Sequence, residues 1–245
     1  MGINSFAKKM LRDFFESQGF SIVRAEDHLG STMKGALKAI AGRKHIVNTV
    51  IDVGASNGQW SSLLMDYYPR CNYLLIEAQP VHEKDLRQFC DTHKNADFVL
   101  AAAGEKEGRI NFNTNDPFGG QASLTPYSTN NITVPVTTID SVIASRRLKG
   151  PYLIKLDTHG YEVPIFKGAE TVLAETEVII IECYNFRIAP ECLLFHEICA
   201  YLEAKDFRCI DMVDIMHRPY DKSLWQMDLV FVRKGREEFL YESYE

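Results

Sequence analysis

Two short polar segments, residues 157–160 and 182–185, carry side chains that could move a proton, and each follows an apolar stretch. His159 is the best candidate for a general base because the ordinary pKa of histidine lies near neutral pH. Asp157 could instead act as the base, orient His159 or bind an amino group. A hydrogen-bonded histidine at the end of a strand would give the same pattern, so the acid–base role is a hypothesis.

The same two segments could also hold a divalent cation, because oxygen ligands from neighbouring strand ends suit Mg²⁺. The candidate ligands are Asp157, His159, Glu182 and Asn185. Some enzymes ionise a hydroxyl in this way. We nevertheless predict a site without metal.

A turn that contains glycine follows the apolar run 50–53 and leads into a helix. Gly54 lets the chain turn without a side chain in the way, and Gly58 permits the helix start to pack closely on the strand. The helix start presents unpaired N–H groups with partial positive charge. Glu77 ends a second apolar strand, about 20 residues further on, where an acid reaches the hydroxyls of a ribose. Together these features predict a nucleotide site.

Dehydrogenases that use a nicotinamide and methyltransferases that use S-adenosylmethionine both have this arrangement. The dehydrogenase turn is G-x-G-x-x-G, whose middle glycine lets a pyrophosphate touch the backbone. Here Ser56 occupies the middle position and Gly58 follows too soon. Asp52 suits the ammonium and sulfonium groups of S-adenosylmethionine better than a diphosphate, although a capping carboxylate would look alike. The turn favours a methyltransferase, with an NAD-dependent oxidoreductase and a non-catalytic binding protein as alternatives.

Strands and helices alternate after residue 46, which predicts an α/β fold with a parallel sheet. We expect strands near 47–53, 72–77, 97–101, 152–157 and 177–182. We expect helices near 58–68, 82–93, 161–173 and 193–204. Two further strands, 207–212 and 226–232, have no helical pattern between them, so the final strand should be antiparallel. Ligands bind at the carboxyl ends of such strands, where the polar segments lie.

An inserted hairpin is expected between the third and fourth parallel strands. Two alternating stretches, 109–113 and 132–137, flank a loop over 115–120 that is dense in turn residues. This loop could be a mobile lid over an acceptor or a plain surface loop. The residues placed to cover an acceptor are Phe118, Gly119, Gly120, Gln121 and Ser123.

The first 45 residues predict a helical preface. Apolar residues at helical spacing predict a helix over 5–18, and a second helix, capped by Ser31, should end at Gly42. The domain organisation is therefore a preface over 1–45 and one catalytic domain over 46–245.

Composition limits the partners of this chain of 245 residues. The net charge of −6 and the pI near 5.7 argue against a surface that grips nucleic acid. The six cysteines form no C-x-x-C pair, which is typical of reduced thiols in a cytoplasmic protein. Because no apolar run reaches the length of a membrane span, we expect no stable membrane insertion. The oligomeric state stays open.

Several ordered motifs over roughly residues 46–185 resemble the FkbM family of methyltransferases. The motifs are Ile51-Asp52-Val53-Gly54-Ala55-Ser56-Asn57-Gly58, Ile76-Glu77-Ala78-Gln79-Pro80, Ala101-Ala102-Ala103-Gly104 with Gly108, Thr138-Ile139-Asp140-Ser141, and Leu153-Ile154-Lys155-Leu156-Asp157 with Gly160 and Glu162. The resemblance implies a Rossmann-like class I fold with a seven-stranded, mostly parallel sheet in the order 3-2-1-4-5-7-6 and helices on both faces.

The resemblance also implies a reaction. S-adenosyl-L-methionine would be the methyl donor, S-adenosyl-L-homocysteine the product, and a hydroxyl of a sugar, glycan or natural product the acceptor. The residues that would bind the cofactor are Asp52, Gly54, Ala55, Ser56, Asn57, Gly58, Glu77, Ala78, Gln79, Ala102 and Asp157. The family usually has an acid where this chain has His159, so the resemblance does not assign the catalytic group there.

Overall fold

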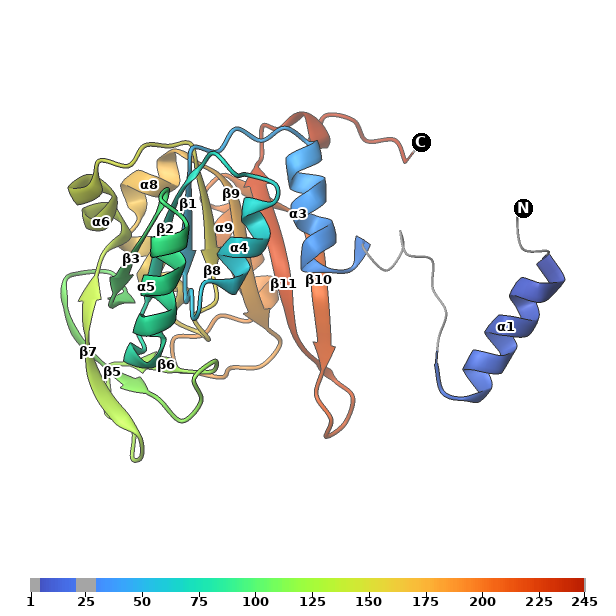
Figure 1. Ribbon diagram of the computed structural model, residues 1–245, viewed down its shortest axis with the longest axis horizontal. Helices are drawn as coiled ribbons and strands as arrows, with labels where there is room; N and C mark the ends of the chain where they lie inside the picture. Colours follow the sequence, from blue (N-terminus) through green and yellow to red (C-terminus); the bar gives the residue numbers. More distant parts are fainter. Residues whose placement is uncertain (1–4, 21–29, 245) are drawn as a thin grey trace.

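The main sheet forms from short runs of buried residues that are mostly β-branched or aliphatic. The computed structural model describes residues 5–20 and 30–244 (Figure 1). The strands of this sheet are β1 (Thr49–Val53), β2 (Asn72–Glu77), β3 (Ala96–Leu100), β8 (Tyr152–Leu156), β9 (Thr176–Tyr184), β10 (Phe207–His217) and β11 (Leu224–Arg233).

These seven strands are arranged in the order β10-β11-β9-β8-β1-β2-β3. Strand β11 is antiparallel to both of its neighbours, and the other pairs are parallel. Numbered within this sheet, the order is 3-2-1-4-5-7-6. The predicted fold class and the antiparallel final strand are therefore confirmed.

Helices cover both faces of the sheet. One face carries α3 (Met33–Gly42), α4 (Gln59–Met65) and α5 (Glu83–Thr92), which lie in front of the sheet in Figure 1. The other face carries α6 (Ile139–Arg146), α7 (Glu162–Lys167), α8 (Glu170–Ala174) and α9 (Phe195–Glu203). Leu37, Leu64 and Leu86 are fully buried on the first face, and Phe166 and Leu202 are fully buried on the second. Two apolar cores thus hold the carboxyl ends of the strands in place.

The predicted hairpin is part of a small four-stranded sheet in the order β4-β7-β5-β6. Its strands are β4 (Ala102–Ala103), β5 (Gly108–Asn113), β6 (Gln121–Ser123) and β7 (Asn131–Thr137). The antiparallel pairing of β5 with β7 is the one that the sequence predicts. Ile110, Phe112 and Val134 alternate inward and join the second core. Strands β4 and β6 were not predicted, because segments of two or three residues are too short to show the alternation of side chains that is typical of a strand.

Three helix predictions differ from the structure. The helix expected over 161–173 is two helices, α7 and α8, separated by Gly168 and Ala169. Gly168 allows a close approach there, since a Cβ at this position would overlap the carbonyl oxygen of Gly104. Helix α6 was not predicted, although the Thr138 side chain caps it by accepting from the Ser141 N–H. Thr32, and not Ser31, caps α3 by accepting from the Gly35 N–H.

The chain ends add helices outside the sheet. Helix α1 (Ser5–Ser17) agrees with the prediction for residues 5–18, and its Met10 and Phe14 side chains are exposed. The short helix η2 (Glu237–Phe239) follows β11. All six cysteines are free thiols, as predicted. Among the residues that the structure describes, no helix is long and apolar enough to cross a membrane. The domain boundary at residue 46 stays a prediction.

Candidate active site

A pocket opens at the carboxyl ends of β1, β2 and β8, the edge where parallel sheets bind ligands. The lining includes Glu77 at the end of β2 and residues of the segments that follow the three strands: Gly54, Ser56, Ala78, Gln79, Asp157, Thr158 and His159. The remaining walls include Ala101, Ala102, Ala103, Phe112, Pro117, Phe118, Gly120, Ala122, Tyr161 and Ile165. The pocket thus has a polar rim from the main sheet and an apolar wall from the small sheet and α7.

The turn after β1 brings backbone to the surface of the pocket. Gly54 has a φ of +74°, and a Cβ at this position would overlap the carbonyl oxygen of Asp157. Ser56 also has a positive φ, of +50°, which is uncommon for a residue other than glycine. Such strained residues concentrate where a ligand is bound. The turn is therefore shaped for a close approach of backbone to a ligand.

Glu77 ends β2 with its carboxylate in the pocket. Its Oε2 accepts from the Ser56 N–H at 2.7 Å, and its Oε1 accepts from the Gln79 N–H at 2.7 Å. Burial raises the pKa of this carboxyl, and the two N–H bonds oppose that rise. The bonds fix the orientation of the carboxylate and leave lone pairs for further donors, such as hydroxyl groups.

Four predicted cofactor residues lie beside the pocket without lining it: Asp52, Ala55, Asn57 and Gly58. Asp52 is fully buried and accepts from the Ser61 hydroxyl at 2.7 Å. Side chains alternate along a strand, so Val53 lines the pocket while Asp52 faces α4. The Asn57 side chain accepts from a backbone N–H at the start of α4. None of these four residues is therefore part of the lining of the pocket.

Lys155 connects Asp52 to the pocket. Its Nζ lies 3.3 Å from Asp52 Oδ1 and 3.2 Å from Asp157 Oδ2, and it donates to the Gly54 carbonyl oxygen at 3.3 Å. Burial disfavours its charge, but the two carboxylates outweigh burial and raise the pKa of this lysine. Lys155 thus forms an ion pair with each of these two acids. Lys155 therefore holds Asp157 at the rim.

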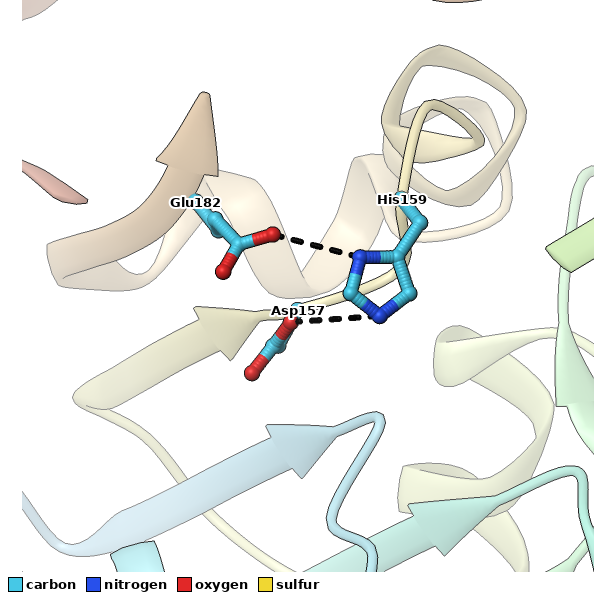
Figure 2. Close-up of side chains that lie close together, drawn as sticks. All are labelled: Asp157, His159 and Glu182. Atoms are coloured by element: carbon cyan, nitrogen blue, oxygen red, sulfur yellow. Dashed lines mark hydrogen bonds and ion pairs between the residues drawn. The ribbon is translucent and has the colours of Figure 1, made fainter. Parts of the chain in front are cut away.

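His159 lies at the rim with its ring held on two sides, as Figure 2 shows. Nδ1 is 3.2 Å from Glu182 Oε1, and Nε2 is 3.1 Å from the Phe118 carbonyl oxygen and 3.8 Å from Asp157 Oδ1. Burial lowers the pKa of His159, but the bond to Glu182 and the charges of Asp157 and Glu182 raise it to about 9. Its φ of +51° is a second strained position.

The predicted lid loop lies over this pocket. The carbonyl oxygen of Pro117 lies 2.8 Å from Gln79 Nε2 and 2.7 Å from His82 Nε2. His82 belongs to the short helix η1 (Pro80–His82) that follows β2. Together with the bond from His159 to the Phe118 carbonyl, these contacts tie the loop to both halves of the rim. Pro117 and Phe118 line the pocket, so the loop covers it, and its mobility stays a prediction.

Three of the four candidate cation ligands come together. Ligand atoms of Asp157, His159 and Glu182 all lie within 4.8 Å of one another. The fourth candidate, Asn185, donates through its side-chain Nδ2 to the Leu224 carbonyl oxygen. The site therefore offers two carboxylates and one imidazole.

The side chains at the end of β9 and just after it contact protein groups. The Tyr184 hydroxyl donates to Glu182 Oε1. Phe186 stacks on Trp225 at a centroid distance of 5.2 Å, and Arg187 pairs with Glu197 at 2.7 Å.

The sequence analysis did not predict the apolar wall of the pocket or the contact of His82 with the Pro117 carbonyl oxygen of the loop. Phe112 and Ala122 come from the small sheet, and Tyr161 and Ile165 come from the segment after β8. The inward alternation of β5 marks Phe112 as buried, but only the folding of the small sheet against α7 shows that it faces the pocket.

The fold and the pocket define a class I methyltransferase that uses S-adenosylmethionine. A family model described as the methyltransferase FkbM domain matches residues 52–209, which is more than half of the chain. The chain belongs to the FkbM family of methyltransferases. No curated protein matches the sequence.

Solved structures with a related fold have low sequence identity. A precorrin-6y C5,15-methyltransferase from Geobacter metallireducens is 11% identical, with coverage of 88% of this chain and 95% of the other and a TM-score of 0.44. The fibrillarin pre-rRNA processing protein of Methanococcus jannaschii is 16% identical, with coverage of 81% and 75% and a TM-score of 0.46. These likenesses say nothing about the acceptor of this chain.

Proposed function

We propose that this methyltransferase acts on a hydroxyl group of a sugar, glycan or natural product, and that His159 receives the hydroxyl proton. The observation that carries the proposal is a titratable imidazole at the rim of the pocket, beside the carboxylate of Asp157. A carboxylate beside an imidazole stabilises the imidazolium that forms when the ring takes up a proton.

The lining of the pocket fits S-adenosylmethionine. Glu77 offers lone pairs to the ribose hydroxyls, and the carboxylate of Asp157 suits the ammonium group. Ala78, Gln79 and Ala102 would border the adenine, next to the apolar wall. When bound, the cofactor supplies an electrophilic methyl group. Gly54 and Ser56 would lie against its methionine part.

The residues at the rim account for acid–base chemistry. A hydroxyl is barely ionised at neutral pH, and a positioned general base contributes roughly 10²- to 10⁴-fold to a rate. With a pKa of about 9, His159 is an imidazolium at neutral pH and becomes a base as the pH rises. We therefore expect the rate of methyl transfer to rise with pH up to about 9.

Net charge and free thiols support the proposed class of acceptor and the proposed cellular location. The net charge of −6 favours a neutral or small acceptor over nucleic acid. The free thiols agree with a cytoplasmic location, which stays a proposal, as does the division at residue 46.

Ligand binding tests the cofactor assignment. S-adenosylhomocysteine is expected to raise the Tm, because a ligand that binds only the folded state stabilises it, whereas NAD⁺ should leave the Tm unchanged. A rise in Tm with NAD⁺ alone would contradict the assignment and support the oxidoreductase hypothesis.

Transfer of a radiolabelled methyl group tests the acceptor class. The panel contains oligosaccharides, glycolipid extracts, polyketide-like natural products and an RNA pool. The proposal expects base-stable label in a hydroxyl-bearing acceptor from the first three groups. Label found only in RNA, or only in nitrogen or carbon positions, would contradict O-methylation of such acceptors.

A further inference from the structure

Glu182, near the end of β9, receives hydrogen bonds from three directions. His159 Nδ1 lies 3.2 Å from its Oε1, and the Tyr184 hydroxyl donates to the same oxygen. Gln226 of β11 donates to its Oε2 at 2.9 Å. The Glu182 side chain is only 13% exposed and does not line the pocket. Its contacts are therefore with protein groups and not with the ligand space of the pocket.

The placement of these groups follows from the strands. Residues two apart on a strand project from the same side, so the side chains of Glu182 and Tyr184 share one side of β9. Because β8 and β9 are parallel neighbours, this side lies next to the segment that carries His159. The Tyr184 hydroxyl is 2.8 Å from His159 Nδ1. Both side chains thus meet Nδ1, while Nε2 faces the Phe118 carbonyl oxygen and Asp157 at the rim of the pocket.

We propose that Glu182 and Tyr184 are positioning residues for His159. Both ring nitrogens face an acceptor, but the Glu182 carboxylate is a stronger acceptor than the Phe118 carbonyl oxygen, so the neutral ring keeps its proton on Nδ1 and Nε2 is the basic nitrogen. The Tyr184 hydroxyl, bonded to the same carboxylate oxygen, keeps that carboxylate turned toward the ring. The inference rests on the proposed role of His159 and deepens it, because it states which nitrogen takes the proton.

Charged groups from four elements determine how strongly His159 holds its proton. Asp157 follows β8 with Lys155 behind it, Glu162 begins α7, Glu182 lies on β9 and Asp228 lies on β11 beside Glu182. Glu182 is the acid that bonds directly to the ring. Removal of its charge should therefore lower the pKa of His159 by roughly one unit or more.

NMR of the isolated protein tests the inference without an acceptor. Long-range ¹⁵N–¹H spectra report the tautomer and the pKa of each histidine, and His159→Asn assigns the signal. The wild type should show a pKa of about 9 and an Nδ1–H tautomer above it. Glu182→Gln should lower that pKa and mix the tautomers, and Tyr184→Phe should have a smaller effect. Glu177→Gln, on the same strand and outside this contact network, is the matched control.

Each outcome has a separate meaning. If Glu182→Gln folds with an unchanged Tm while the pKa and tautomer of His159 match those of Glu177→Gln, the positioning role is wrong. If Glu182→Gln does not fold, Tyr184→Phe decides by the same two readouts. The proposed function fails differently, when His159→Asn retains full methyl transfer although the NMR result stands. With an acceptor in hand, Glu182→Gln should lower kcat, leave the KM for S-adenosylmethionine unchanged and add no further loss to His159→Asn.

Discussion

The two halves of the pocket rim are built in different ways. In the cofactor half, at the ends of β1 and β2, Glu77 is held by two backbone N–H groups and the turn contains Gly54. In the catalytic half, at the ends of β8 and β9, His159 is held by the side chains of Glu182 and Tyr184. Every residue except proline has a backbone N–H donor, whereas a side-chain hydrogen bond requires a particular residue type at that position.

This difference separates binding from chemistry. The cofactor half holds one carboxylate that backbone N–H groups stabilise, so its orientation does not depend on other ionisable groups. The catalytic half gathers the carboxylates of Asp157 and Glu182 around one histidine, and their charges raise the pKa of His159 and of the nearby Asp228. Substitution of Glu77 should therefore change affinity, and substitution of His159 or Glu182 should change rate or pH dependence.

Replacement of the base should have the largest effect. His159→Asn is expected to lower kcat by roughly 10²- to 10⁴-fold, because general-base catalysis is lost. The Kd for S-adenosylhomocysteine should stay unchanged, since the ring is not in the cofactor half. Steady-state kinetics and calorimetry measure the two quantities. The control is His196→Asn, which replaces an exposed histidine on α9. Equal losses of kcat in His159→Asn and His196→Asn would contradict the distinction between a cofactor half and a catalytic half.

Replacement of the ribose carboxylate should have the next largest effect. Glu77→Gln is expected to weaken S-adenosylhomocysteine binding by about 1.5–3 kcal/mol, or roughly 10- to 150-fold in Kd, because hydrogen bonds to a charged group are lost. At saturating cofactor the kcat should remain close to that of the wild type. Glu170→Gln, an exposed acid on α8, is the control. An unchanged Kd for Glu77→Gln would place the ribose elsewhere.

The crowding of carboxylates in the catalytic half predicts a smaller, pH-dependent effect on stability. Burial, with the charges of Glu182 and Asp157, raises the pKa of Asp228 from 3.8 to about 7. Because the pKa of Asp228 is higher in the folded state, this residue makes its full contribution to stability at pH values below its unfolded pKa of 3.8. That contribution is lost as the pH rises through the folded-state pKa of about 7.

Asp228→Asn should therefore raise the Tm at pH 8 more than at pH 5, because the substitution removes a charge that only the higher pH develops fully. Each kcal/mol by which the substitution raises the free energy of unfolding corresponds to an increase in Tm of about 2–4 °C for a chain of this size. Thermal unfolding at both pH values measures the difference. The same change in Tm at both values would show that Asp228 does not ionise in this range.

Chelation should have the smallest effect. His159 donates from both nitrogens, and Asp157 is paired with Lys155, so the three groups that could hold a cation already have protein partners. Methyl transfer is expected to be unchanged by EDTA and by added Mg²⁺. A loss of activity with EDTA that Mg²⁺ restores would instead assign a cation to Asp157, His159 and Glu182.

The sequence predicts the cofactor half better than the catalytic half, for a physical reason. The turn at Gly54 and the acid at Glu77 each follow one strand, so a local pattern identifies them. Asp52 was expected in the pocket from its residue type at the end of the first strand, but side chains alternate along a strand, and Asp52 faces Ser61 of α4. The contacts of His82 with the loop over 115–120, and of Tyr184 with His159, join distant segments that only the folded sheets bring together.

A structure of the protein bound to S-adenosylhomocysteine tests the central claim most directly. The account predicts hydrogen bonds from both ribose hydroxyls to the carboxylate of Glu77, adenine against Ala102, and the sulfur on the side of the pocket that carries His159. A ribose out of hydrogen-bonding reach of Glu77, or a sulfur directed away from His159, would contradict it.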